Sequence, residues 1–576
     1  MAVVLPDWCE LARGDGPVLL VAPHGGRRPR VDPAAPPPNL KVNDVHTAEL
    51  TRELASRLGA TAVINHGCDR NELDLNRISQ VRRRAPWFLE LLRDEVEKIL
   101  SRHAQAEILF VHGWNVGQAK CDLGIGAKVT SDGLVTSSGG RLTITKSYLD
   151  ERIAGLRAAL KERDIATFLG VRYPASHPNN LLQLFSDRGS EEIHSPIEEQ
   201  FAGWARDGAV QALQLELGVP LRWPGVWRER LIKCVVGEFR THPLALRDLS
   251  VRPEERPLPS GGVSKPVLSP VEGAVGTCAS ADALRDGRSE AASSGRTEAQ
   301  RSVETLAVTR SNLPRRATSL QFYDAVADIG LMSGIGPVGK DTVAARLLLF
   351  LGGQRVALFT GERTPPRDDL IVEPLHFETE GETTTLRFTG PILHLEDGTE
   401  YLDLEAAFAA SRLGEVEVHL RFVADAVDES GATFGRVEGF VDIGSERREI
   451  STGAFANAAS TRSGLRDGHT VLAAAFGDAY GLLASVGSAG ASRVIEFREG
   501  QAGEIGCAST VRRDRETIEV MMDEGVVSAI RLSRMEILRS LGAGGYARVT
   551  FGTARFRSKD REGHGLYEFA NLVEKS

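Results

Sequence analysis

The spacing of apolar residues changes along the chain and predicts two kinds of structure. Before residue 220, short runs of consecutive apolar residues alternate with long segments whose apolar residues recur every three or four positions. The runs are typical of buried strands, and the second spacing is typical of amphipathic helices. Strands that alternate with helices predict an α/β domain with a mostly parallel sheet. The expected strands are 18–22, 61–65, 107–113, 165–171 and 210–217.

Three long helices are expected between these strands, at 43–59, 86–103 and 147–164. The first segment opens on Asn43 and Asp44, and short polar side chains of this kind are favoured helix caps. In a sheet covered by helices, ligand-binding groups gather where the strands end. Polar residues that follow an expected strand are therefore candidates for chemistry.

In the last part of the chain, polar and apolar residues alternate instead, which is typical of half-buried strands. The segment 345–362 predicts a hairpin that turns at Gly352 and Gly353, because glycine adopts the conformations that tight turns need. The pattern predicts an antiparallel all-β domain, either a barrel or a sandwich. Further alternating segments are 383–405, 415–424, 435–444 and 515–532.

Between these two parts, no aromatic residue other than histidine occurs from 240 to 321. The interval is rich in Pro, Gly, Ser, Ala and charge, a composition that buries too little apolar surface to fold. We therefore expect an α/β domain at 1–248, a disordered linker at 249–313 and a β-rich domain at 314–576. Whether the linker is a native element or an insertion stays open.

Charge and cysteine content exclude several classes of protein. A net charge of −9 and the lack of any basic run argue against a nucleic-acid binder. The six cysteines form no CxxC pair, so neither a disulfide framework nor a thiolate zinc site is expected. No signal peptide or membrane span is predicted, and the expected location is the cytoplasm. The oligomeric state stays open.

Polar groups lie at or just after the ends of three of the expected strands. They are His24 in "VLLVAPHGG", His112 in "EILFVHG" and Glu216 in "VQALQLELG". Taken singly, such a histidine is more often a structural residue than a ligand. Two neutral imidazoles and one carboxylate at one sheet edge, however, are a common zinc-binding set that leaves a position for water. The bound ion lowers the pKa of that water to about 7.

The order "PHGG", "DLNR", "HG", "CDLGIG" and "LQLEL" resembles the N-formylglutamate amidohydrolase family over roughly the first 220 residues. That family is similar to zinc carboxypeptidases and succinylglutamate desuccinylases, and the resemblance implies a phosphorylase/hydrolase-like α/β fold with one zinc ion. It implies that His24 and His112 bind the metal together with Asp44, with Glu49 as the alternative. Glu216 then corresponds to the general base that activates the metal-bound water.

The same resemblance implies roles for four further residues. Asn76 and Arg77 match the pair that binds a substrate carboxylate, a task suited to the planar guanidinium group. Arg70 is a candidate for stabilising the developing oxyanion. Asp122, in the expected loop 121–126, is a candidate for binding substrate or supporting the metal ligands. The loop 173–186 is either part of the substrate pocket or a structural turn.

Three positions depart from the family pattern. Gly25 stands where a serine usually follows the first histidine, Phe110 stands where an aspartate usually precedes the second, and Gly113 stands where a serine usually follows it. These changes leave the metal ligands in place but alter the groups around them. The resemblance therefore predicts an amidohydrolase, and these departures leave open whether formylglutamate is its substrate.

The predicted function is zinc-dependent hydrolysis of an amide in a carboxylate-bearing N-acyl amino acid or a related small molecule. The alternative is a catalytically inactive, hydrolase-like protein that binds a ligand or partner through its β domain. The segment 435–444 and its flanking strands loosely resemble the lipocalin-like, carotenoid-hydratase-related β domains. This second resemblance leaves the role of the β domain open.

Overall fold

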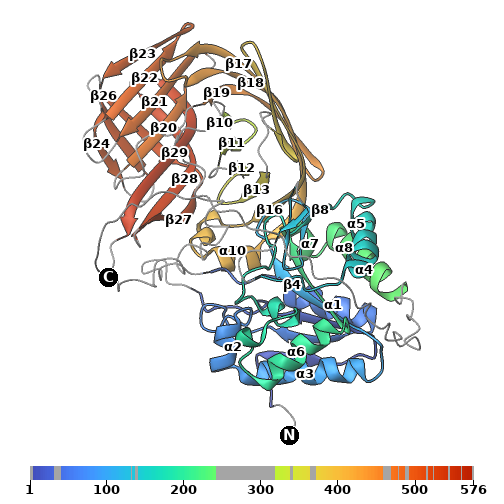
Figure 1. Ribbon diagram of the computed structural model, residues 1–576. Coiled ribbons are helices and arrows are strands. Elements are labelled where there is room, and N and C mark those ends of the chain that lie inside the picture. Colours follow the sequence, from blue (N-terminus) through green and yellow to red (C-terminus); the bar gives the residue numbers. More distant parts are fainter. Residues whose placement is uncertain are drawn as a thin grey trace, which may run out of the picture.

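The computed structural model describes most of the chain outside the predicted linker. The described residues are 4–30, 41–130, 133–135, 140–241, 318–337, 342–363, 371–457, 469–477, 479–486, 492–506, 508–513, 517–522, 525–542, 545–558 and 561–573. The predicted linker, 249–313, lies outside them. A mixed α/β part precedes this interval and an all-β part follows it, which agrees with the predicted two-part arrangement (Figure 1).

The N-terminal part is built on one seven-stranded sheet with the order β1-β3-β2-β4-β9-β5-β8. Its strands are β1 (Cys9–Ala12), β2 (Val18–Ala22), β3 (Thr61–Asn65), β4 (Ala106–Gly113), β5 (Lys120–Gly124), β8 (Ala166–Leu169) and β9 (Val210–Leu217). Four neighbouring pairs are parallel, but β1 with β3 and β5 with β9 are antiparallel. The sheet is therefore only partly parallel, and the expected loop 121–126 contributes strand β5.

Helices cover both faces of this sheet (Figure 1). One buried cluster joins the sheet to α1 (Thr47–Leu58), α5 (Ala154–Lys161) and α8 (Val226–Thr241). The cluster on the opposite face joins it to α2 (Ile78–Arg84), α3 (Pro86–Leu100) and α6 (Pro196–Arg206). Burial on both faces explains why the strand sequences read as unbroken apolar runs. The short elements are α4 (Lys146–Tyr148), η1 (Leu149–Ile153), η2 (Leu181–Phe185), η3 (Ser190–Glu192), α7 (Val219–Arg222), β6 (Lys128–Thr130) and β7 (Gly133–Val135).

The predicted cap of the first helix is wrong. Helix α1 begins at Thr47 and its N-cap is His46, in a left-handed conformation and without a side-chain cap. The side chains of Asn43 and Asp44 are instead bound to groups far away in the sequence. Tertiary contacts have overridden a local preference, and the two polar residues serve the site described below.

In its described residues, the C-terminal part contains two ten-stranded antiparallel sheets, which agrees with the predicted antiparallel β structure. The first contains β10 (Thr318–Asp324), β11 (Ile329–Pro337), β12 (Val343–Phe350), β13 (Val356–Arg363), β14 (Ile371–Val372), β15 (Leu375–Glu380), β16 (Thr383–Leu395), β17 (Arg412–Val427), β18 (Thr433–Ile443) and β19 (Glu446–Ala456). The second contains β20 (His469–Ala475), β21 (Tyr480–Val486), β22 (Ser492–Arg498), β23 (Gln501–Gly506), β24 (Ala508–Arg513), β25 (Thr517–Met522), β26 (Gly525–Arg531), β27 (Met535–Gly542), β28 (Gly545–Ser558) and β29 (Arg561–Val573). No helix in the described ranges is both long and apolar enough to cross a membrane.

Two details of the first β sheet can be compared with the prediction. The hairpin of β12 and β13 is confirmed, and both Gly352 and Gly353 have the positive φ that its turn requires. The segment 383–405 is not extended throughout. After β16 it forms the 3-10 helix η5 (Gly398–Leu402) and the start of α10 (Leu404–Ala410), a helix that lies against the α/β domain (Figure 1).

Candidate metal centre

Three buried side chains from separate segments meet at the strand ends. His24 follows β2, His112 lies near the end of β4, and Asp44 lies in the segment between β2 and α1. One ligand atom from each of them lies within 4.8 Å of the others. Strands β2 and β4 are parallel neighbours, so their carboxyl ends place the two histidines side by side. This group could hold a metal ion.

The free nitrogens of the two imidazoles fit such an ion. Nε2 of His24 lies 2.7 Å from Oδ1 of Asp74, while Nδ1 of His112 lies 3.1 Å from Oδ2 of Asp44. The remaining nitrogen of each ring is buried and has no hydrogen-bond partner within the described part of the chain. Burial lowers the pKa of His112 to about 4, so this ring is neutral at pH 7. Neutral imidazole is the form that binds metals.

Asp44 is held in its ionised form by its neighbours. Its Oδ2 faces both histidines, at 3.4 Å from Nδ1 of His24 and 3.1 Å from Nδ1 of His112. Its Oδ1 accepts a hydrogen bond of 3.1 Å from Nη1 of Arg70. Burial opposes ionisation, but the Arg70 charge and the contacts with both histidines hold the pKa of Asp44 well below its usual range. A buried carboxylate with these partners is suited to binding a cation.

The alternative ligand, Glu49, lies apart from this cluster. Its side chain on α1 is 42% exposed and forms an ion pair of 3.4 Å with Arg27. Helical geometry explains the difference, because the residues of α1 that face the sheet are Ala48, Leu50 and Leu54.

Glu216 lies beside the cluster, on the neighbouring strand. In the register of β4 and β9, Glu216 is opposite His112, so both side chains leave the same face of the sheet. Its Oε1 accepts a hydrogen bond of 2.8 Å from Nε2 of Gln214. Burial and the nearby charge of Asp44 raise the pKa of Glu216 well above its usual range. A carboxyl group with a raised pKa is suited to proton transfer near neutral pH.

The loop 173–186 reaches this carboxyl group through Asn180. Nδ2 of Asn180 lies 3.4 Å from Oε1 of Gln214, which in turn binds Glu216. Asn180 also forms an isolated bridge with Arg77. The loop therefore contacts Gln214, the residue that binds the Glu216 carboxyl group, and also the segment that follows Asp74. Both contacts are made by Asn180, to which the sequence assigned no role.

Arg70, Asn76 and Arg77 lie around the two aspartates. Arg70 pairs with Asp44, and Nε of Arg77 lies 3.7 Å from Oδ2 of Asp74. The backbone N–H of Asn76 donates to Oδ1 of Asp74, while its buried side-chain oxygen has no partner among the residues described. Arg77 is partly exposed, with 29% of its side chain accessible. The structure thus brings the three residues to Asp44 and Asp74, beside the candidate ligands, and leaves Arg77 partly exposed.

Asp122 occupies the other side of Glu216. The two residues are opposite each other in the antiparallel pair of β5 and β9. The Asp122 carboxylate accepts backbone hydrogen bonds of 3.2 Å from Val171, 2.7 Å from Arg172 and 2.8 Å from Tyr173. These three bonds hold the segment 171–173 beside Glu216.

The departures from the family pattern coincide with close packing. A side chain at Gly113 would bring its Cβ within 2.5 Å of Nη1 of Arg222. Arg222 is fully buried, and its guanidinium binds the carbonyl of Val45 at 2.7 Å and the side chain of Asn115 at 2.8 Å. It therefore ties the segment after Asp44 to the segment after His112. At Gly25, a Cβ would lie 2.7 Å from the carbonyl oxygen of Asn65.

Asp74 and Arg222 were not among the predicted site residues. Asp74 belongs to the quoted motif "DLNR", so the motif itself was a signal for it. Nothing in the local sequence distinguishes Arg222 from a surface arginine, because its partners lie 107 and 177 residues away.

If His24, Asp44 and His112 hold a metal ion such as zinc, replacing Asp74 with asparagine should weaken its binding by about 10- to 100-fold, because the Asp74 carboxylate orients the His24 ring through Nε2. Competition with a chromophoric chelator measures this affinity. D187N is the matched control, since Asp187 lies in the same domain with 70% of its side chain exposed. An unchanged affinity in D74N would mean that Asp74 does not support the metal.

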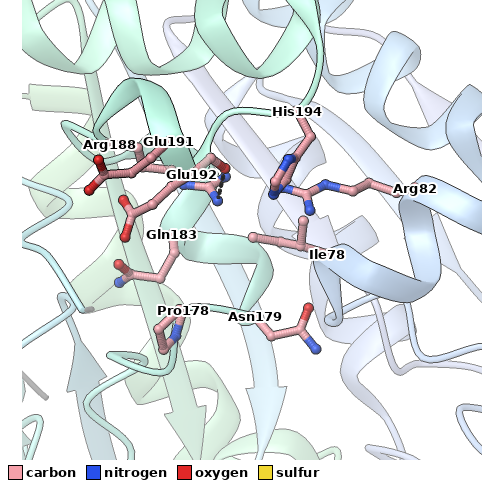
Figure 2. A pocket seen from close by; sticks show the side chains of 9 residues that line it. All are labelled: Ile78, Arg82, Pro178, Asn179, Gln183, Arg188, Glu191, Glu192 and His194. Carbon is pink, nitrogen blue, oxygen red and sulfur yellow. Dashed lines mark hydrogen bonds between the residues drawn. The ribbon is translucent and has the colours of Figure 1, made fainter. Parts of the chain in front are cut away.

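A separate hollow of about 310 Å³ is lined by residues of α2, η2 and η3 and of the loops beside them (Figure 2). None of the candidate metal ligands lines it. Its arginines, Arg82 and Arg188, both pair with the carboxylate of Glu198, at 2.6 and 3.2 Å. Since the positive charges are already paired, we assign this hollow no part in the chemistry.

No protein-family model matches the chain, and no curated protein matches it. Among solved structures, N-formylglutamate amidohydrolase from Ralstonia eutropha JMP134 is 17% identical with a TM-score of 0.27, over 40% of this chain and 95% of that one. Kievitone hydratase from Nectria haematococca is 10% identical with a TM-score of 0.28, over 44% of this chain and 88% of that one. Both are distant structural resemblances, so the side chains of the site must support any functional proposal.

Proposed function

We propose that this protein is a zinc-dependent amidohydrolase acting on a carboxylate-bearing N-acyl amino acid or a related small amide. The observation that carries the proposal is the buried group of His24, Asp44 and His112 within 4.8 Å, with Glu216 opposite His112 in the sheet. A zinc ion held by the three residues would supply Lewis acidity, which stabilises negative charge on oxygen.

The remaining residues would bind substrate and move protons. Glu216 takes a proton from the attacking water and passes it to the leaving amine, a cycle that its raised pKa favours. Arg70 stabilises the negative charge that develops on the amide oxygen. Asn76 and the outward-facing Arg77 bind the substrate carboxylate, with Arg77 supplying two parallel N–H donors.

Metal content and amine release test the proposal. The purified full-length chain is analysed for divalent metals, stripped with a chelator and reloaded with zinc. It is then incubated with N-acyl amino acids whose side chains carry a carboxylate. Matched N-acyl amino acids with uncharged side chains serve for comparison. We expect one zinc per chain and amine release from the acidic series. If neither the purified nor the zinc-treated protein holds stoichiometric metal, the hydrolase proposal fails. Stoichiometric metal without amine release would favour a binding protein.

Replacing Arg77 with lysine keeps the positive charge but removes the planar pair of donors. We expect KM for an acidic substrate to rise about tenfold with zinc content unchanged, because the substitution affects binding and leaves the ligands alone. Steady-state kinetics with parallel metal analysis measure both quantities. R52K is the control, since Arg52 pairs with Glu10. A wild-type KM in R77K would remove Arg77 from the substrate pocket.

A further inference from the structure

The segment that carries Asp44 has little regular structure of its own. Residues 41–44 are neither helix nor strand. The backbone N–H of Asp44 donates to the carbonyl of His24 at 2.8 Å, and the backbone N–H of Lys41 donates to the side chain of Asn71 at 2.8 Å. A metal ligand on irregular backbone needs further contacts to hold it in position.

Those contacts come from the β domain. Glu405, on α10, is buried, and its Oε2 accepts hydrogen bonds of 3.0 Å from both the backbone N–H and the side-chain amide of Asn43. Its Oε1 accepts a bond of 2.9 Å from the backbone N–H of Arg28. Asp403 adds a contact of 2.6 Å to the Arg28 guanidinium. One carboxylate of the β domain therefore binds the segments that follow His24 and precede Asp44.

Asn43 connects Glu405 to the candidate metal site through further hydrogen bonds. Its side-chain amide donates to Oδ1 of Asp69 at 2.9 Å, and its side-chain oxygen accepts the backbone N–H of Arg70 at 3.0 Å. Arg70 in turn binds Oδ1 of Asp44. Glu405 is thus connected to the candidate ligand twice, through the chain from Asn43 to Asp44 and through Arg70.

Apolar residues on both sides of Asn43 and Asp44 also pack against the β domain. Val42 and Val45 are buried in one cluster with Leu348, Phe408 and Met535 of the β domain. Helix α10 lies at this junction between the two parts of the molecule (Figure 1). The backbone that presents Asp44 is therefore enclosed by the β domain.

We propose that Glu405 is a positioning residue of the metal centre, and that the β domain completes the site by holding the Asn43–Asp44 segment. This inference rests on the proposed function, because it presupposes that His24, Asp44 and His112 bind zinc. The proposal gives the β domain a role in forming the metal site, in addition to any small molecule that the β domain itself binds.

The test replaces Glu405 with glutamine in the full-length chain. The new amide places an N–H group where an acceptor faced the donors of Arg28 or Asn43, while side-chain size is preserved. We expect zinc affinity to fall about 10- to 100-fold, as for other residues that orient metal ligands. Chelator competition measures the affinity, and the absorption spectrum of the cobalt-loaded protein reports ligand geometry.

The matched control is E415Q. The exposed Glu415 also bridges the two parts, accepting a hydrogen bond of 3.3 Å from Trp227, but it contacts none of the candidate ligands. Its zinc affinity and cobalt spectrum should match the wild type. Near-UV circular dichroism of the metal-free proteins checks that each variant is folded. If E405Q does not fold, Asn43 is replaced with alanine instead. N43A removes the side-chain hydrogen bond between Asn43 and Glu405 from the Asn43 side, and we expect zinc affinity to fall as in E405Q.

The outcomes separate the two proposals. Wild-type affinity and spectrum in folded E405Q, or an equal loss in E415Q, would overturn the positioning role while leaving the hydrolase proposal intact. A wild-type protein that binds no zinc would overturn the proposed function itself, whatever E405Q does. Weakened zinc binding in E405Q alone, with an altered cobalt spectrum, supports the inference.

Discussion

Replacing His112 with alanine is expected to abolish stoichiometric zinc binding and turnover together. His112 is buried and neutral, and it is one of the three candidate ligands that meet here in the described part of the chain. Its loss leaves two protein ligands for an ion that is normally held by three or four. Zinc affinity should therefore fall by more than the roughly 10- to 100-fold expected for a supporting residue.

Metal analysis after dialysis and chelator competition measure the effect. H66A is the matched control, because His66 lies in the same domain and is exposed. Retention of one tightly bound zinc per H112A chain would show that the ion lies elsewhere. Loss of zinc in H66A as well would point to general destabilisation.

Replacing Glu216 with glutamine should separate turnover from metal binding. Glutamine keeps the size of the side chain but cannot accept a proton at neutral pH, so kcat should fall by about 10²- to 10⁴-fold. Zinc content and affinity should stay at the wild-type level, because three other side chains hold the ion in the proposed site. Steady-state kinetics and metal analysis on the same samples provide both measurements.

E97Q serves as the control for this substitution, since Glu97 is exposed on α3. If E216Q loses zinc to the same degree as H112A, Glu216 is itself a ligand and the role given to Asp44 is mistaken. If E216Q keeps full activity, another group must act as the base.

Much of the architecture could be predicted because it depends on local patterns. The sequence of β2 is an unbroken apolar run because helices cover both faces of the sheet. The hairpin of β12 and β13 could be predicted from its turn residues, Gly352 and Gly353. The position of His24 and His112 also follows from the sequence. Both come at the carboxyl ends of strands, and parallel strands bring those ends to one edge.

Where local preference and tertiary contacts compete, the pattern fails. The sequence before α1 predicts that Asn43 or Asp44 caps the helix, but Asp44 faces two histidines and Asn43 faces Glu405. A cap contributes typically about 1 kcal/mol. A buried carboxylate with several charged and hydrogen-bonding partners outweighs that preference. Strand β5 was likewise missed because its pairing with β9 is a long-range contact.

The sequence by itself therefore determined the alternation of the main strands and helices, the change to antiparallel sheets and the histidines at the strand ends. Only the tertiary structure decided which groups surround the candidate ligands. Asp74 lies 50 residues from His24, Arg222 lies 177 residues from Val45, and Glu405 lies 362 residues from Asn43. Hydrophobic periodicity is set by neighbouring residues, whereas these hydrogen bonds exist only once distant segments have folded together.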